Sequence, residues 1–396
     1  MLNTARYLAF ASAVVILFSI AAYNILFVLA LVALLLSKAP LRLPRIWLPL
    51  GLFLLVTLLS LASSGDMSAG LPQVRKLYVY SMLLVASSLF RDLRVIRWLF
   101  VSWAGAGTLV AARGIVQFFG KLSEARALGR NFYEYYEPER ITGFMSHWMT
   151  FSGQGMFVLL MLMAYLFWSP AARKRGLWFY LLCFTTLCVA LLLGYTRSIW
   201  IATAISALYL IWFWKRWLVA LAPLALLIGY LAAPVSIRTR AQSIFHAQGN
   251  EFRLLTWRTG LRMIEAHPWL GLGPEQVKIQ FMDYLPPDTP RPLPSGWYGH
   301  LHNIYLQYAA ERGIPSLLLL IWMLATMLAD FSKAQRSLPP GPQDRRFVLH
   351  GAIAVVIATM IAGVFEHNLG DSEVLIMFLV VAACGYVAVE KEPELA

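Results

Sequence analysis

The chain has 396 residues, of which 59% are hydrophobic and only 13% are charged, and its mean hydropathy is +0.65. Soluble domains carry about a quarter charged residues, so this composition excludes an ordinary soluble protein and predicts a polytopic, all-α membrane protein. The formal net charge of +13 falls in short basic clusters between apolar runs. Such clusters orient membrane helices, and nucleic-acid binding is therefore not expected.

Apolar runs of membrane length follow one another along the chain. The first, 7–37, is longer than one span of about 20 residues requires, and Tyr23-Asn24 interrupts it near the middle. We expect two short helices there, with one long tilted helix as the alternative. The split predicts about twelve transmembrane helices, and the single helix predicts eleven. After the basic residues up to Arg45, one span is expected to end at Ala62 and another to cover 71–90. The next span follows Arg97 and should end near Gly120. The remaining spans are expected over 150–168, 177–193, 198–214, 218–233, 316–331, 347–365 and 372–389.

Neither a disulfide framework nor a thiolate metal site is predicted, because the cysteines all lie inside apolar runs: Cys183, Cys188 and Cys384. The N-terminal apolar stretch continues past the length of a signal-peptide core and lacks a small-residue cleavage site. A cleavable signal peptide is therefore not expected.

The positive-inside rule assigns a side to each loop. Basic clusters at 91–97, 173–175, 215–216 and 333–346 occur at alternate loops and should share the cytoplasmic side. The remaining loops should then be external, and they cover 121–148, 194–197, 234–301 and 366–368. We expect one integrated membrane domain with N-terminal helices over 1–233, a long external loop with short helices over 234–301, and C-terminal helices over 302–396.

The long loop contains a segment that reads as a helix, with Asn250 as the expected N-cap and Pro268 as its stop. At about 100° per residue, Arg258 and Arg262 share one face while Arg253 projects roughly opposite. The alternative is an amphipathic helix that lies solvated on the bilayer surface.

Arg197 is the most unusual charge of the chain. It ends the short turn that begins at Gly194, and an external arginine at a helix start opposes the positive-inside bias. The N-terminus of a helix already favours an anion through its N–H groups and its dipole. Arg197 is therefore a candidate anion ligand, and the alternative is an arginine that extends to lipid phosphates.

His302 and Asn303 open a helical segment that reaches Arg312, where Gly313-Ile314-Pro315 breaks it. A histidine there can be neutral at physiological pH and accept a proton, although a structural, hydrogen-bonded histidine is the alternative. His300 with His302 is too sparse for a metal site, so none is predicted. The chain has no phosphate-binding Gly-Lys-Ser/Thr loop for ATP.

Several of these segments together resemble the signature of the O-antigen ligase and polymerase superfamily. The match is carried by His302-Asn303 with Gly313-Ile314-Pro315, Phe252 to Trp257, His267 to Gly273, Thr196 to Trp200, and Ile141 to Phe144 with His147. The resemblance spans most of the chain from about residue 70. Ser316, Leu317 and Leu318 depart from the ligase pattern of a second glycine followed by threonines, which keeps a polymerase as the alternative.

The resemblance implies a bacterial inner-membrane glycosyltransferase of the GT-C kind with its active site facing the periplasm. Its donor would be a glycan linked to undecaprenyl diphosphate, and its acceptor a lipid A-core sugar or, in a polymerase, another glycan. It implies an inverting reaction that needs neither metal, ATP nor another cofactor. A secondary transporter is the alternative from another class, but the midspan sequences are nearly free of acids and show no internal repeat.

The same resemblance implies roles for individual residues. Arg197 and Arg253 would hold the diphosphate, and His302 would accept the proton of the acceptor hydroxyl or orient that hydroxyl. Arginine suits this task because its planar fork binds phosphate oxygens in pairs and offsets the charge that develops on the leaving group. Supporting residues would be Arg140, Arg75, Tyr195, Trp257, His300 and Asn303.

A lipid-linked donor also needs lateral access from the outer leaflet. We therefore expect an apolar groove beneath the long loop, capped by arginines. The proline-rich segment 285–297 should form an extended flap over it, because so many prolines disfavour a packed domain.

Overall fold

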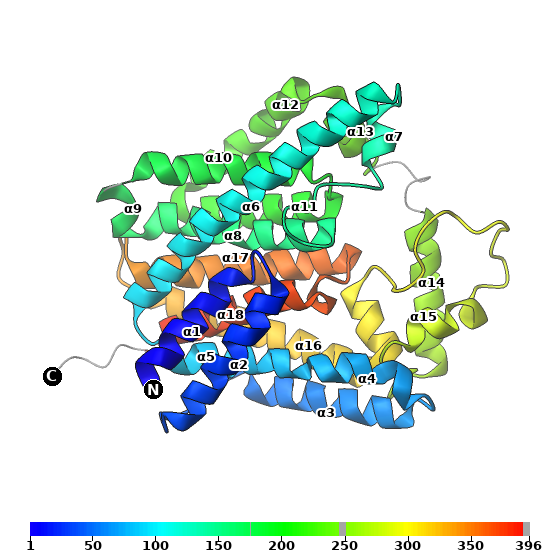
Figure 1. Ribbon diagram of the computed structural model, residues 1–396, viewed down its shortest axis with the longest axis horizontal. Coiled ribbons are helices and arrows are strands. Elements are labelled where there is room, and N and C mark those ends of the chain that lie inside the picture. Colours follow the sequence, from blue (N-terminus) through cyan, green and yellow to red (C-terminus); the bar gives the residue numbers. More distant parts are fainter. Residues whose placement is uncertain (175, 245–250, 391–396) are drawn as a thin grey trace.

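The computed structural model describes residues 1–174, 176–244 and 251–390, and every regular element in these ranges is a helix (Figure 1). Within them, six helical stretches are long and apolar enough to cross a membrane: α6 (Leu93–Ala127), α8 (Trp148–Trp168), α11 to α12 (Arg197–Ala232), α16 (Ile304–Arg336), α17 (Asp344–Phe365) and α18 (Ser372–Val389). Shorter apolar helices are α2 (Ile20–Leu36), α3 (Trp47–Ser63) and α10 (Leu177–Leu193). The all-helical, multi-pass class is confirmed. The count of twelve and the three-region division stay predictions, and Asn250 lies outside the described residues.

The first apolar run forms two helices, α1 (Leu2–Val15) and α2, as predicted, but the break lies before Ser19 and not at Tyr23-Asn24. Ser19 caps α2, since its hydroxyl accepts a hydrogen bond from the N–H of Ala22 at 3.3 Å. Tyr23 lies inside α2, where its ring stacks on Phe27 with 5.3 Å between the ring centroids. Tyr23 and Asn24 therefore belong to the helix, where the Tyr23 ring packs against Phe27, and they do not interrupt it.

Two further expectations need correction. The predicted span 71–90 is divided into α4 (Met67–Arg75), the 3₁₀ helix η1 (Lys76–Tyr80) and α5 (Ser81–Leu89). Helix α6 continues to Ala127 and does not end near Gly120, because most of the residues that follow are strong helix formers, namely lysine, leucine, glutamate, alanine and arginine. The first part of the predicted loop 121–148 is thus helical.

The remaining elements are short or connect the long helices. They are α7 (Phe132–Tyr136), α9 (Pro170–Lys174), η2 (Arg216–Leu221), α12 (Ala222–Ala232), α13 (Val235–Gln242), α14 (Glu251–Ala266), α15 (Gln276–Gln280), η4 (Phe281–Tyr284) and η5 (Asn368–Gly370). Helix α11 itself covers Arg197–Lys215. The predicted loop over 234–301 therefore contains short helices, as expected. The side of the membrane on which it lies stays a prediction.

Helices α8, α17 and α18 cross the middle of the molecule and form its core (Figure 1). Small residues allow the close packing that membrane helices use in place of hydrophobic burial. A Cβ atom at Gly351 of α17 would lie 2.6 Å from the sulfur of Met161 on α8. The Met161 side chain therefore occupies the space that a side chain at position 351 would take.

Loops that the positive-inside rule assigns to different sides gather at opposite ends of the bundle. At one end Arg97 pairs with Asp344 at 2.7 Å, and Arg45 with Asp330 at 3.0 Å. At the other end, α7, α13 and α14 lie together (Figure 1). There the hydroxyl of Tyr136 donates to the carbonyl of Leu193 at 2.6 Å. The two sets of loops thus lie at opposite ends, and which end faces the cytoplasm stays a prediction.

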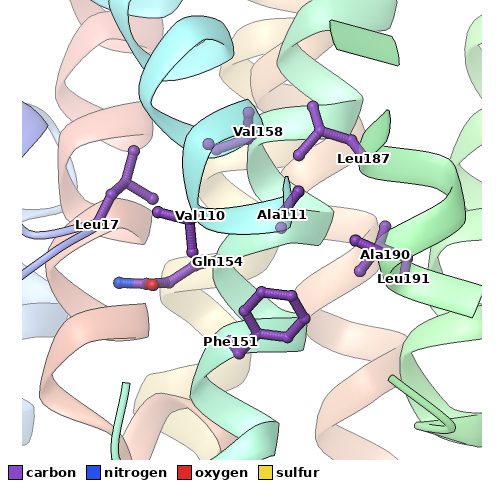
Figure 2. Close-up of a pocket in the computed structure, with 11 residues that line it drawn as sticks. Leu17, Val110, Ala111, Phe151, Gln154, Val158, Leu187, Ala190 and Leu191 are labelled. Carbon is purple, nitrogen blue, oxygen red and sulfur yellow. The ribbon is translucent and has the colours of Figure 1, made fainter. Parts of the chain in front are cut away.

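A small apolar cavity lies between α6, α8 and α10, with Leu17 at one side of it (Figure 2). Gln154 is the polar side chain in its wall, and its amide donates to the carbonyl of Ile16 at 3.1 Å, which satisfies the end of α1. The cavity measures about 10 Å³, room for about one water molecule. It is too small for a lipid chain, so it is not the expected groove. Its wall is formed by Leu17, Gly107, Val110, Ala111, Phe151, Gln154, Gly155, Val158, Leu187, Ala190 and Leu191.

Candidate active site

The helix that begins after His302 is fixed by a break at Gly313, where φ is 79° and ψ is 167°. Pro315 has no N–H to bond the carbonyl of Glu311, and the N–H of Gly273 bonds it instead at 2.8 Å. A Cβ atom at Gly313 would lie 2.0 Å from the carbonyl oxygen of Trp269. The two motifs around Gly273 and Gly313 therefore form one structural unit that holds the 304–312 segment in place.

His302 lies just before this segment. Helix α16 begins at Ile304, and Asn303 is its N-cap, since its side-chain oxygen accepts from the N–H groups of Tyr305 at 2.9 Å and Leu306 at 3.0 Å. The expectation that His302 itself opens the helix is wrong. Its φ is +49°, in the left-handed region that non-glycine residues seldom adopt and that is found at functional sites. By capping the first turn of α16, Asn303 fixes the position of His302 directly before the helix.

Both ring nitrogens of His302 face oxygen acceptors. Nδ1 lies 3.4 Å from Oε2 of Glu366, and Nε2 lies 3.2 Å from the carbonyl oxygen of Trp297. Neutral imidazole carries one N–H, so both acceptors are satisfied together only when both nitrogens carry hydrogen. Nδ1 is thus the nitrogen directed at Glu366, and Nε2 is the nitrogen directed at the Trp297 carbonyl.

Glu366 connects this histidine to Arg253. Its second oxygen, Oε1, lies 2.5 Å from Nη2 of Arg253, and its side chain is only 2% exposed. Sequence reasoning missed Glu366, because an acidic residue in a short loop looks like a solvated one. The only signal in the sequence is the placement of its loop on the same side as His302. This carboxylate fixes the orientation of both predicted functional groups.

His300 packs against His302, with 4.0 Å between the ring centroids, and its Nδ1 accepts from the backbone N–H of His302 at 3.1 Å. Burial, reinforced by the nearby charges of His302 and His367, lowers the pKa of His300 to about 2. His300 is thus a neutral acceptor that supports the strained backbone. Within the described residues, no group of three or more His, Cys, Asp or Glu side chains could hold a metal ion.

Arg197 lies in the wall of an adjoining cleft of about 680 Å³. Its Nη1 donates to the carbonyl of Ser243 at 2.5 Å, so α13 holds the guanidinium in place. Phe252 belongs to the same wall, and its ring is 5.0 Å from that of His302. The positive charges of Arg240 and Arg253 are near enough to repel that of Arg197. The structure thus brings Arg197, Arg253 and His302 to one end of the bundle.

The strained backbone of Tyr195, with φ of +49°, joins two further arginines. Its carbonyl accepts from Nε of Arg240 at 2.9 Å and lies 3.4 Å from Nη1 of Arg140. The Glu137 carboxylate pairs with Arg140 at 2.8 Å and with Arg240 at 3.0 Å. Burial, with a smaller effect of the Arg240 charge, lowers the pKa of Arg140 to about 10, so it stays a cation at neutral pH.

Arg240 was missed by sequence reasoning, because it follows a span and looks like a topological charge. In the structure it is buried and lies in the wall of the cleft beside Arg197. Arg140 is buried against the ring of Trp148, 3.7 Å from its centroid. Arg140 and Tyr195 therefore support the cleft from behind, and Arg240 faces it.

Two predicted supporting residues are not brought to this site by any contact among the described residues. Arg75 is exposed at the end of α4. Trp257 is half-buried on α14, and its indole nitrogen has no hydrogen-bond partner in the described part of the chain. Their predicted roles rest on the sequence alone.

The two outward arginines of α14 bind the proline-rich segment. Arg258 pairs with Asp288 at 2.7 Å, and Arg262 donates to the carbonyl of Leu285 at 2.7 Å. Arg253 points away from both, as the helical spacing predicted. Most of 285–299 is exposed, and its last residues reach His302 through Trp297. The segment therefore lies along α14 and covers the site as an extended flap.

Residues 181–321 match the family model described as O-antigen ligase. No curated protein matches the chain. The matched range contains Arg197, Arg240, Arg253 and His302, whereas Glu366 lies beyond it. The resemblance read from the sequence motifs is confirmed over these residues, and the motif at Ile141 to Phe144 with His147 lies outside the match.

Proposed function

We propose that this chain, which carries an O-antigen ligase segment over residues 181–321, transfers a glycan from a lipid-linked diphosphate donor to a sugar hydroxyl. The observation that carries the proposal is the Glu366 carboxylate, which contacts His302 with one oxygen and Arg253 with the other. The family suggests undecaprenyl diphosphate as the carrier, a lipid A-core sugar as the acceptor, and the periplasmic face of the bacterial inner membrane as the place.

The donor diphosphate fits the arginine side of the site. Breaking the glycosyl–phosphate bond leaves negative charge on the diphosphate, which positioned cations stabilise in the transition state. Arg197 and Arg253 supply guanidinium forks that bind phosphate oxygens in pairs. Arg240 supplies a third fork in the cleft that Arg197 lines, and Arg253 lies on α14 next to Phe252 of the same wall. Glu366 and the Ser243 carbonyl keep two of these forks oriented before the donor arrives.

The acceptor side is served by His302. The acceptor oxygen attacks the anomeric carbon, the bond from that carbon to the diphosphate oxygen breaks, and the hydroxyl proton moves to Nε2 of His302. Glu366 holds hydrogen on Nδ1, which leaves the lone pair on Nε2. The Trp297 carbonyl now occupies the position beside Nε2, so the acceptor displaces this part of the flap. One direct displacement inverts the anomeric centre.

A polymerase of the same superfamily would use the same chemistry with a glycan as acceptor. The departure at Ser316 is the observation that favours it, because ligases often have glycine there. The structure gives this serine a local purpose, since its hydroxyl oxygen lies 2.9 Å from the carbonyl oxygen of Tyr308 and 2.8 Å from that of Gly313. The one hydroxyl hydrogen is shared between these two acceptors at the helix break, in either kind of enzyme.

The test is transfer by the purified protein in detergent, with chelator and without ATP, from an undecaprenyl-diphosphate-linked glycan. Lipid A-core and a second lipid-linked glycan are offered separately as acceptors, and Arg253→Ala is the inactive control. We expect transfer to lipid A-core. Transfer only to the second glycan would identify a polymerase, and no transfer to either acceptor by the wild-type protein would contradict glycosyl transfer.

A further inference from the structure

A second cationic cavity lies near His302, between η1, the 304–312 segment of α16 and the loop that joins α17 to α18. Its polar wall includes Lys76, Tyr80, Tyr308, Arg312, His367 and Ser372, and no carboxylate lines it. We call it the Arg312 cavity. None of its residues lines the cleft that contains Arg197. It is therefore a separate cavity.

Two buried nitrogen atoms of the Arg312 cavity have no hydrogen-bond partner in the described part of the protein. The Arg312 side chain is buried, with 5% of the residue exposed, and its Nε has no hydrogen-bond partner there. The guanidinium lies 4.6 Å from the ring centroid of Tyr308 and 5.2 Å from that of Phe53. Nδ1 of His367 is also buried without a partner among these residues. Buried cations and donors normally have partners, so this arrangement indicates a missing ligand.

The nearest carboxylate, that of Glu311, is already engaged. Its Oε1 accepts from the side-chain amide of Gln307 at 2.9 Å and from the backbone N–H of Glu275 at 2.9 Å. Glu275 does not line the cavity, and its carboxylate is bound to Lys278 at 2.6 Å and to the side-chain amide of Gln73, a residue of the cavity wall. These carboxylates partly offset the positive charge of Arg312, but neither accepts a hydrogen bond from its Nε atom.

We propose that the Arg312 cavity binds a phosphate group carried by the acceptor, an inference that rests on the proposed function. A guanidinium fork, an ammonium group and hydroxyl donors together suit the three free oxygens of a phosphate monoester. The position supports the acceptor as its source. His302 contacts the donor cleft through Phe252, and on its other side His300 lies 5.8 Å from His367 of the cavity.

The Arg312 cavity is closed in this conformation, with about 20 Å³, room for about one water molecule. Lys76 is exposed, and its side chain can move outward at little cost. Entry of a phosphate therefore requires Lys76 to open the wall, after which its ammonium group binds the phosphate from outside. Lys76 should matter for acceptor affinity and not for the fold.

The experiment compares a phosphorylated acceptor with the same acceptor after phosphatase treatment. We expect Arg312→Gln and Lys76→Gln to raise the KM for the phosphorylated acceptor about 10- to 100-fold, the loss of one or two charge-assisted hydrogen bonds. The donor KM should stay unchanged, as should kinetics with the dephosphorylated acceptor. Arg94→Gln removes the same charge from an exposed position in the first turn of α6, at the opposite end of the bundle, and should change none of these values.

If both variants keep the wild-type KM for the phosphorylated acceptor, the proposal is wrong while glycosyl transfer stands. Should Arg312→Gln fail to fold, Lys76→Gln alone decides, because its side chain is exposed. Inorganic phosphate and vesicles with anionic phospholipid are added in separate arms. If either competes with the dephosphorylated acceptor and removal of the acceptor phosphate has no effect, the site takes that other anion and the acceptor assignment fails. Absence of transfer by the wild-type protein would instead contradict the proposed function.

Discussion

Arg253 and Glu366 are 113 residues apart in the chain, yet their side chains meet at 2.5 Å with Glu366 almost fully buried. A buried ion pair is costly to break, by about 3–5 kcal/mol, because the remaining charge is left without a partner. The pair therefore holds the long loop against the α17–α18 connection. It also places an arginine of the donor site beside His302.

Replacing Glu366 tests this arrangement. Glu366→Gln keeps an oxygen toward His302 but removes the charge that orients Arg253. Loss of a hydrogen bond to a charged group costs about 1.5–3 kcal/mol, so we expect transfer to fall roughly 10- to 150-fold. Glu366→Asp, which retains the charge, should lose less. Initial rates on folded preparations check this, and equal rates for Glu366→Gln and wild type would show that the carboxylate is not needed.

The arginines of the donor site should not be replaceable by lysine. Arg197→Lys and Arg253→Lys keep a positive charge but lose the planar fork, so each should be nearly as damaging as alanine, with donor KM and kcat both affected. Arg258→Lys, which changes the exposed pair with Asp288, is the matched control and should stay near wild type. A lysine variant at 197 or 253 with close to full activity would show that only positive charge matters.

The turn at Gly313 should tolerate no side chain. In Gly313→Ala the new Cβ would overlap the Trp269 carbonyl, a backbone atom that cannot move away. Gly341 also has positive φ, of 114°, but open space around it, so Gly341→Ala should cost only about 1–2 kcal/mol. Thermal unfolding in detergent should show a much larger loss for Gly313→Ala. Equal losses for the two variants would mean that the contact between the motifs is not rigid.

Much of the fold was predictable because apolar runs bounded by polar or glycine residues define membrane helices. Helices α10 and α18 begin and end at the predicted residues. The break in the first run was predicted at Tyr23-Asn24 and lies before Ser19. Hydropathy does not reveal it, because a single serine can cap a new helix inside an apolar run. The extension of α6 was missed because charged helix formers resemble a loop when only hydropathy is considered.

Some residues of the site were also predictable from the sequence, and others were not. Arg197, Arg253 and His302 were recognisable because a charge or a histidine in an unusual position is visible in a sequence. Glu366 and Arg240 were not, since their importance comes from burial and from partners far away in the chain. Burial of a loop residue depends on tertiary packing, which local sequence does not encode.

Acid should destabilise the protein through two neutral histidines. Burial is the largest cause that lowers the pKa of His300 to about 2 and that of His367 to about 3. A histidine with a folded pKa below its unfolded value of about 6.5 contributes stability that is complete above that pH and is lost as pH falls toward the folded pKa. We expect the unfolding temperature to decline below about pH 6.5. The decline should be shallower in His300→Asn, and an unchanged slope would contradict the burial of a neutral His300.

The central claim is that His302 takes the proton of the acceptor, and turnover measured with donor binding on the same preparations of His302→Gln and His302→Ala tests it most directly. Glutamine keeps hydrogen bonding but cannot accept a proton. A general base contributes about 10² to 10⁴ in rate, so both variants should lose turnover by that order while donor affinity stays near wild type, because the arginines hold the diphosphate. A glutamine variant with near wild-type turnover across neutral pH, or loss of donor affinity in both variants, would contradict the account.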